Sequence, residues 1–135
     1  VLLEAAKLEN PNLSLICLAG FYNGNNYSLY GTRTIKSSEE FYPDKTFISC
    51  TGVTLNKRLT DISLNEIDTK KEMMDKSEET YLLVDHTKFE VAGPFFLGNF
   101  NEIDCIVTDN FNYTPEVSET LRTITKKHGV RIITA

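Results

Sequence analysis

Five short apolar runs set the strongest limit on how this chain can fold. They lie at residues 13–18 (LSLICL), 46–50 (TFISC), 81–85 (YLLVD), 104–109 (DCIVTD) and 130–134 (VRIIT). None of them alternates cleanly between apolar and polar residues, which is typical of strands that are buried on both faces of a parallel sheet. We therefore expect five strands in a mostly parallel sheet.

Helical patterns separate several of these runs. The clearest begins at Ser63, the expected N-cap, and Glu66 follows three residues later to form a capping box. Its apolar face carries Leu64, Ile67 and Met74. A second helix is expected from Thr114 as N-cap, through Pro115 in the first turn, to a stop at Gly129. Its apolar stripe is Val117, Leu121 and Ile124.

Two further segments are less regular. Residues 31–42 have a weaker helical pattern that Pro43 would end, and residues 92–100 predict a short edge strand or a loop because they contain Pro94 and Gly98. Strands that alternate with helices indicate a layered α/β domain. The expected fold is three-layered with a mostly parallel sheet.

Size and composition limit the classes of function. A chain of 135 residues with 41% hydrophobic content is expected to form one domain, residues 1–135. Its net charge of −5 argues against binding of nucleic acid by this segment alone, so an anion site would have to be local. The chain starts at Val1 in an apolar helical pattern (Leu2, Leu3, Ala6), which suggests a piece of a longer protein.

The cysteines and the hydropathy pattern bear on the compartment. Cys17, Cys50 and Cys105 are far apart and each lies in an apolar run, which favours buried free thiols in a reducing cytoplasm. No apolar segment approaches about 20 residues and no signal-peptide pattern is present, so we expect neither a membrane span nor a leader.

Small or polar residues follow four of the apolar runs. They are Ala19–Gly20, Thr51–Gly52, Asp85–Lys88 and Thr108–Asp109. Because ligands bind at the carboxyl ends of the strands of open parallel sheets, these residues predict a binding site. The alternative is that Asp85 caps a turn and that residues 85–88 form a solvated loop.

One helical lysine is placed unusually. On a helical wheel Lys70 falls between Met73 and Met74, and Lys71 falls between Ile67 and Leu64, so at least one ammonium group lies at the edge of the buried face. Such a lysine is paired, or extends its ammonium group to solvent. The wheel does not choose between the two lysines.

Zinc and the common catalytic motifs are not indicated. His86 and His128 are the only histidines, and neither has a Cys or a second His at ligand spacing. The chain has no GxGxxG, Walker or GxSxG motif.

Several motifs together resemble the effector-sensing domain of the DeoR family of bacterial transcriptional regulators. They are DKTFISCTG, the pair Leu59–Thr60, Glu66 with Lys70, VDHTKF and IDCIVTD. The resemblance covers essentially the whole chain, and it selects Lys70 over Lys71.

The resemblance implies a fold similar to ribose-5-phosphate isomerase, glucosamine-6-phosphate deaminase and coenzyme A transferases, truncated at its N-terminus. It also implies a non-enzymatic sensor that binds a phosphorylated sugar, with no cofactor or metal, and that forms a homo-oligomer. Operator DNA would be bound only by a separate N-terminal winged helix-turn-helix. The expected effector-binding residues are Gly20, Thr51, Gly52, Lys70, Asp85 and Lys88.

Departures from the family pattern bear on affinity. The family's early Asp-x-Gly-Thr/Ser-Thr loop is absent, Ala19–Gly20 replaces Gly-Gly, and Asp61 and Ser63 stand where the family often has Thr and Asn. Two alternatives remain open. One is a sugar-phosphate isomerase or deaminase, in which a carboxylate acts as general base and Lys88 stabilises charge. The other is a dimerisation module with a vestigial pocket.

Overall fold

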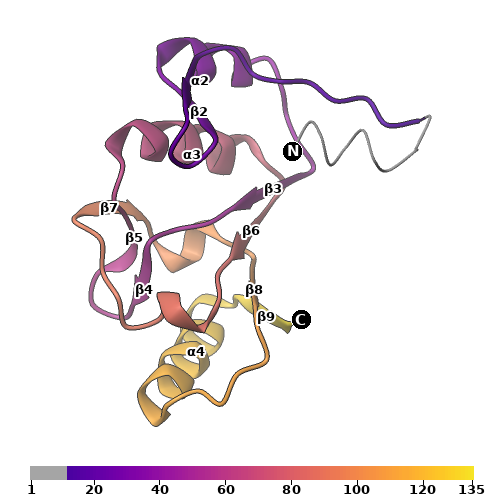
Figure 1. The fold of residues 1–135 in the computed structure, drawn as a ribbon. Coiled ribbons are helices and arrows are strands. Elements are labelled where there is room, and N and C mark those ends of the chain that lie inside the picture. The colour runs from indigo at the N-terminus through magenta and orange to yellow at the C-terminus, as the bar shows by residue number, and fades with distance from the viewer. Residues whose placement is uncertain (1–11) are drawn as a thin grey trace.

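A parallel sheet of four strands runs through the middle of the molecule (Figure 1). The computed structural model describes residues 12–135. The strands have the order β3 (Lys45–Ile48), β6 (Glu79–Leu83), β8 (Cys105–Thr108) and β9 (Arg131–Thr134). All three neighbouring pairs are parallel, and the register aligns one apolar row across the sheet. That row is Ile48, Leu82, Ile106 and Ile132. Four of the five expected strands are confirmed.

The fifth expected strand, residues 13–18, is wrong. This segment has no regular secondary structure, and its Ile16 is 65% exposed. Cys17, expected to be buried, is exposed as well. A strand needs a neighbouring strand for its backbone N–H and C=O groups. Within residues 12–135 no strand pairs with this segment, so its apolar composition does not make it a strand.

Two small antiparallel sheets complete the strands. One has the order β4 (Gly52–Thr54), β5 (Arg58–Asp61) and β7 (Phe95–Gly98), so of the edge strand and the loop that residues 92–100 predicted, the edge strand forms. The other is a hairpin of β1 (Phe21–Asn23) and β2 (Ser28–Tyr30). These strands have three or four residues each, which is too short to show the alternation that identifies a strand in sequence.

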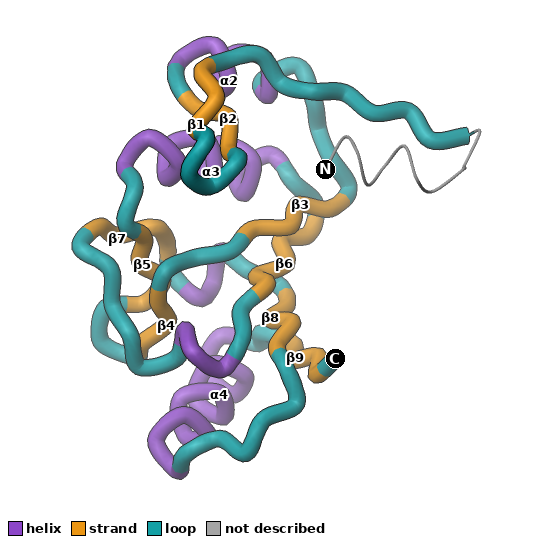
Figure 2. Tube along the Cα trace, viewed as in Figure 1, coloured by secondary structure: helices purple, strands orange, loops and turns teal. Residues whose placement is uncertain are grey.

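Helix α4 (Pro115–His128) forms as expected (Figure 2). The side chain of Thr114 accepts a hydrogen bond from the Val117 amide at 3.3 Å, and Gly129 ends the helix with a φ of 74°. A left-handed residue after the last turn satisfies terminal carbonyl groups, and glycine adopts this conformation at little cost. The helix packs on β9.

Helix α3 (Leu64–Lys76) forms, but its expected capping box does not. Ser63 is the N-cap residue, yet its side chain makes no capping hydrogen bond. The Glu66 carboxylate instead accepts hydrogen bonds from the β1–β2 hairpin, which lies over α3 (Figure 1). Ile67 and Met74 are buried as expected, whereas Leu64 is exposed.

Helix α2 (Thr32–Ser38) is shorter than the segment 31–42 predicted. It ends well before Pro43, with Glu39 as its C-cap. Two short 3-10 helices, η1 (His86–Lys88) and η2 (Phe100–Glu102), follow β6 and β7. Residues 1–6, where a helical pattern was expected, lie outside the described part of the chain.

One apolar core joins the sheets and the helices. Its fully buried members include Leu59, Leu82, Leu97, Phe100 and Ile124, which come from both larger sheets, η2 and α4. The architecture is thus a mixed α/β domain with a parallel sheet, as expected. None of the helices in residues 12–135 is long and apolar enough to span a membrane.

The start of β4 leaves no room for a side chain. A Cβ atom on Gly52 would lie 2.0 Å from the Val91 carbonyl oxygen, which belongs to backbone that cannot rotate away. We therefore expect Gly52→Ala to lower the free energy of unfolding by about 1–3 kcal/mol through overpacking. Urea denaturation would measure this. Gly24→Ala is the control, because the nearest atom to its added Cβ would be 3.8 Å away. Equal midpoints for the two variants would contradict the expectation.

Candidate functional site

An ion pair between α3 and β5 forms the centre of the candidate site. The Lys70 Nζ lies 2.5 Å from Oδ2 of Asp61, the last residue of β5. The Lys70 side chain is 18% exposed and that of Asp61 is 5% exposed. The other Asp61 oxygen accepts hydrogen bonds from the Thr51 hydroxyl at 3.1 Å and the Ile62 amide at 2.7 Å. Thr51, Asp61 and Lys70 thus form one polar cluster in which a buried carboxylate is fully partnered.

The neighbouring lysine has a different environment. Lys71 is exposed, and its Nζ lies over the ring of Phe96, 5.2 Å from the ring centroid. Successive residues of a helix are about 100° apart, so the two ammonium groups point to different faces. Of the two lysines that the wheel could not separate, Lys70 is the one that reaches the cluster.

A buried thiol lies beside the cluster. Burial raises the pKa of the Cys50 thiol to about 12, and the negative charge of Asp61 acts in the same direction. The ammonium groups of Lys70 and Lys88 both oppose this rise. Phe89, which follows Lys88, pairs with Val53 of β4, so η1 lies beside the strand that follows Cys50 and Thr51.

Lys88 differs from Lys70 in having no counter-ion. It is half-buried, and among residues 12–135 no carboxylate oxygen lies within 4.0 Å of its Nζ. An ammonium group that is half-buried and unpaired carries a desolvation cost that a bound anion would relieve. It is the most available cation of the candidate site.

The turn after β6 is capped by Asp85. Its carboxylate accepts hydrogen bonds from the Thr87 hydroxyl and from the Thr87 amide at 2.8 Å. These bonds, and the charge of Lys88, hold the pKa of the Asp85 carboxyl below its usual value, while Asp109 opposes the shift. Asp85 therefore has the local capping role that was the alternative for this residue, and it also lies beside Lys88.

Asp109, which follows β8, is attached to the same turn. Its carboxylate accepts a hydrogen bond from the His86 amide at 2.7 Å and contacts Nδ1 of the His86 ring. The hydrogen bond from the His86 side chain keeps the pKa of Asp109 low. Asp85 and Asp109 both line an open hollow of about 370 Å³ at the carboxyl ends of β6, β8 and β9. Polar residues thus gather at this edge of the sheet, as the sequence predicted.

At both expected glycine positions, neighbouring atoms leave no room for a side chain. Gly52 is required by the close approach of the Val91 backbone. Gly20 has a φ of 142°, and a Cβ atom there would lie 1.9 Å from the Thr34 hydroxyl oxygen. Gly52 follows Thr51 directly, whereas Gly20 lies against Tyr30 of β2 and Thr34 of α2.

Glu66 links the cluster to the β1–β2 hairpin. Its Oε2 lies 3.8 Å from the Lys70 Nζ, and its Oε1 accepts hydrogen bonds from the Asn26 side chain and from the Ser28 hydroxyl at 3.2 Å. Asp61, Cys50, Glu66 and Asp109 are not among the six expected effector-binding residues. Asp109 does belong to the strand-end pair Thr108–Asp109 that predicted the binding edge, whereas the pairing of Asp61 with Lys70 leaves no pattern in the sequence.

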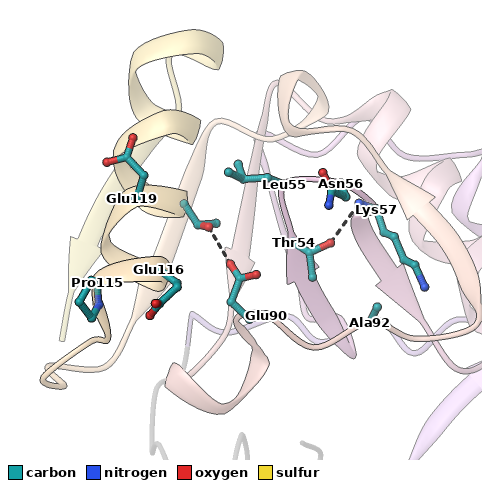
Figure 3. Close-up of a pocket in the computed structure, with 10 residues that line it drawn as sticks. Thr54, Leu55, Asn56, Lys57, Glu90, Ala92, Pro115, Glu116 and Glu119 are labelled. Atoms are coloured by element: carbon teal, nitrogen blue, oxygen red, sulfur yellow. Dashed lines mark hydrogen bonds between the residues drawn. The ribbon is translucent and has the colours of Figure 1, made fainter.

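A larger pocket lies elsewhere (Figure 3). It has a volume of about 670 Å³ and lies between the β4–β5 turn, the segment after η1 and the first turns of α4. Three glutamates line it, Glu90, Glu116 and Glu119, with Lys57 as the single basic residue among the lining side chains. Glu90 accepts a hydrogen bond from the Thr120 hydroxyl at 2.6 Å. None of the expected effector-binding residues lines this pocket, and its acidic walls would repel a phosphorylated ligand.

Within the described residues, no group of three or more His, Cys, Asp or Glu side chains is arranged to hold a metal ion. The ammonium groups of Lys70 and Lys88, with the hydroxyl of Thr51 and the carboxylate of Asp85, have the chemistry to bind an anion with neighbouring hydroxyl groups. Ammonium groups bind a phosphate, and carboxylate and hydroxyl oxygens accept hydrogen bonds from sugar hydroxyls.

Comparison with known proteins gives a consistent result. A family model described as the DeoR C terminal sensor domain matches residues 2–110. The HTH-type transcriptional regulator IolR of Bacillus subtilis is 36% identical over 109 residues, which cover 77% of this chain and 41% of the relative. The HTH-type transcriptional regulator GolR of Listeria innocua is 30% identical over 102 residues, which cover 76% and 40%.

A third relative is the deoxyribose operon repressor of Escherichia coli. It is 28% identical over 101 residues, which cover 75% of this chain and 40% of the repressor. The chain therefore matches about 40% of the length of each of these regulators.

The Lys70–Asp61 pair gives a prediction about stability. Lys70→Met leaves the Asp61 carboxylate buried without its counter-ion, so we expect a loss of about 1–3 kcal/mol in the free energy of unfolding, less than for a fully buried pair. Lys71→Met is the matched control and removes only an exposed cation–π contact, worth about 0.5–1 kcal/mol. Urea denaturation measures both. A larger loss for Lys71→Met would contradict this geometry.

The cysteines give a prediction about reactivity. The thiolate is the reactive form, so the burial of Cys50 and its raised pKa should keep it unmodified in the native protein. Treatment with iodoacetamide at mildly alkaline pH should label Cys17, which is exposed, and leave Cys50 and Cys105 unlabelled until the protein is unfolded. Mass spectrometry of tryptic peptides would assign the sites. Labelling of Cys50 at the rate of Cys17 would be the opposite result.

Proposed function

The chain belongs to the DeoR C-terminal sensor domain family, and we propose that it binds a phosphorylated sugar that modulates operator binding by another part of the same regulator. The observation that carries the proposal is the pairing of Lys70 with Asp61, which also accepts a hydrogen bond from Thr51 after β3, while Lys88 has no carboxylate partner among residues 12–135. A phosphate dianion is the ligand that two such cations favour.

The two lysines differ in their protein partners. Asp61 holds Lys70 in place, whereas Lys88 has no carboxylate partner among the described residues. A phosphate group would bind Lys88 first and share Lys70 with Asp61. Thr51 and Asp85 would then face sugar hydroxyls, while Gly20 and Gly52 contribute only backbone.

The remaining parts of the proposal rest on the family. We infer a three-layer fold similar to ribose-5-phosphate isomerase, glucosamine-6-phosphate deaminase and coenzyme A transferases. We propose a homo-oligomeric repressor that acts in the cytoplasm, where operator DNA is found. The deoxyribose operon repressor is named as a repressor, and the two other relatives are named as transcriptional regulators.

An isomerase or deaminase is the weaker proposal. A general base must be free to accept a proton near the operating pH. The Asp61 carboxylate, which contacts Lys70, also accepts hydrogen bonds from the Thr51 hydroxyl and the Ile62 amide. Both of its oxygens are therefore already partnered by protein donors. The site is therefore better suited to binding than to proton abstraction.

Substitution of the lysines tests the proposed function. In the full-length protein, Lys70→Ala and Lys88→Ala should each weaken binding of the phosphorylated sugar by about 1.5–3 kcal/mol, the range for a hydrogen bond to a charged group. Lys71→Ala should change binding little, because its ammonium group lies over Phe96. A thermal-shift screen of phosphorylated sugars would choose the ligand, and calorimetry would measure the variants. Equal losses at Lys70 and Lys71, or none at Lys88, would refute the site.

A further inference from the structure

We propose that His86 is a further ligand-contacting residue, whose side chain accepts a hydrogen bond from a hydroxyl group of the bound sugar. The inference rests on the function proposed above and adds a specificity determinant to that site. His86 is the first residue of η1, between Asp85 and Lys88, so it lies at the carboxyl end of an inner strand of the sheet. Four observations carry the inference: the two attachments to Asp109, the stacked ring, the free nitrogen and the charges nearby.

Asp109 fixes both the backbone and the ring of His86. One carboxylate oxygen accepts a hydrogen bond from the His86 amide at 2.7 Å, and the other contacts Nδ1 of the ring. The two residues follow neighbouring strands, β6 and β8, whose carboxyl ends lie side by side. A carboxylate can only accept, so Nδ1 carries the hydrogen, and in the neutral imidazole the lone pair is on Nε2.

Phe111 fixes the plane of the ring. The two rings are stacked, with centroids 3.7 Å apart and an angle of 5° between the planes. A ring held at one nitrogen and along one face has little freedom left. Its remaining nitrogen is therefore positioned before a ligand arrives, which lowers the entropic cost of binding.

That remaining nitrogen has no protein partner in residues 12–135. The contacts of the His86 side chain there are Asp109 at Nδ1 and Phe111 on its face, and the side chain is 35% exposed. Nε2 is thus a hydrogen-bonding atom that is oriented by the protein and left for something else. His128 differs, because it lies in the last turn of α4 with its ring tilted by 58° against Phe100.

The charges around His86 favour a hydroxyl group over a phosphate. Asp85 and Asp109 carry carboxylates on either side of the turn, and the pKa of each is held low by its hydrogen bonds, so both are ionised at neutral pH. Lys88 is the cation of the same turn and would take the phosphate. A sugar hydroxyl can donate to Nε2 without repulsion from the two carboxylates.

Two probes separate the hydroxyl contact from the phosphate contact. Calorimetry on the full-length protein would compare ribose 5-phosphate, which carries hydroxyl groups, with inorganic phosphate, which has no sugar. In His86→Asn the amide can replace Nδ1 toward Asp109, while Nε2 is lost. We expect the affinity for ribose 5-phosphate to fall about two- to tenfold, as for loss of one hydrogen bond, and the affinity for inorganic phosphate to stay unchanged.

Two further variants make the test specific. His86→Gln extends an amide to the position of Nε2 and should restore part of the affinity for ribose 5-phosphate, whereas His128→Asn should affect neither probe. An equal loss for both probes in His86→Asn, or no loss for either, would overturn the role of His86 while leaving the proposed function intact. If neither probe binds the wild-type protein and the thermal-shift screen finds no phosphorylated sugar that does, the proposed function fails, and the role of His86 fails with it.

Discussion

The buried carboxylate of Asp61 is the constraint on which the site and much of its surroundings depend. The Asp61 side chain is 5% exposed, and a carboxylate that loses water must be partnered by hydrogen-bond donors or cations. Those partners come from three segments: the Thr51 hydroxyl after β3, the Ile62 amide at the start of the turn into α3, and the Lys70 ammonium one turn and a half along that helix. Because one carboxylate contacts all three segments, it joins the end of the parallel sheet, the small antiparallel sheet and α3.

Close backbone contacts hold the neighbouring segments in place as well. Gly93 passes so close to β5 that a Cβ atom there would lie 2.6 Å from the Asp61 carbonyl oxygen, and its amide donates to the Thr60 hydroxyl at 2.8 Å. Gly52 has a similar contact with Val91. The segment between η1 and β7 is therefore held against both strands of the β4–β5 hairpin. As a result, η1, which carries His86 and Lys88, has a defined position relative to Lys70.

The sequence predicted the elements whose signal is local and did not predict the pairings that are distant. Helix α4 could be delimited at both ends because Thr114, Pro115 and Gly129 each act within one turn. The four strands of the parallel sheet could be found because each contains a short apolar run, although only β8 is buried along most of its length, and Phe47, Leu83 and Ile133 are exposed. The segment 13–18 has the same composition, but whether it becomes a strand depends on a neighbour that its own residues do not specify. Likewise Glu66 has capping-box spacing, yet Asn26 and Ser28, about 40 residues away, provide its hydrogen bonds.

The candidate site shows the same difference between local signals and distant contacts. Its geometry also indicates which part of a ligand would determine specificity. The polar residues at the strand ends located Asp85 and Lys88 in the sequence. The contacts of Lys70 with Asp61 and of His86 with Asp109 join residues 9 and 23 positions apart, so only the folded structure shows them. In the candidate site Asp61, Asp85 and Asp109 each accept hydrogen bonds from protein donors, and Lys88 has no carboxylate partner among residues 12–135. With several carboxylates nearby, a bare anion gains little beyond that one contact. A ligand that also offers hydroxyl donors to the oriented oxygen and nitrogen atoms gains more, because those atoms lose water only when they are matched. Discrimination between phosphorylated sugars therefore depends more on the hydroxyl groups than on the phosphate, which all of them share.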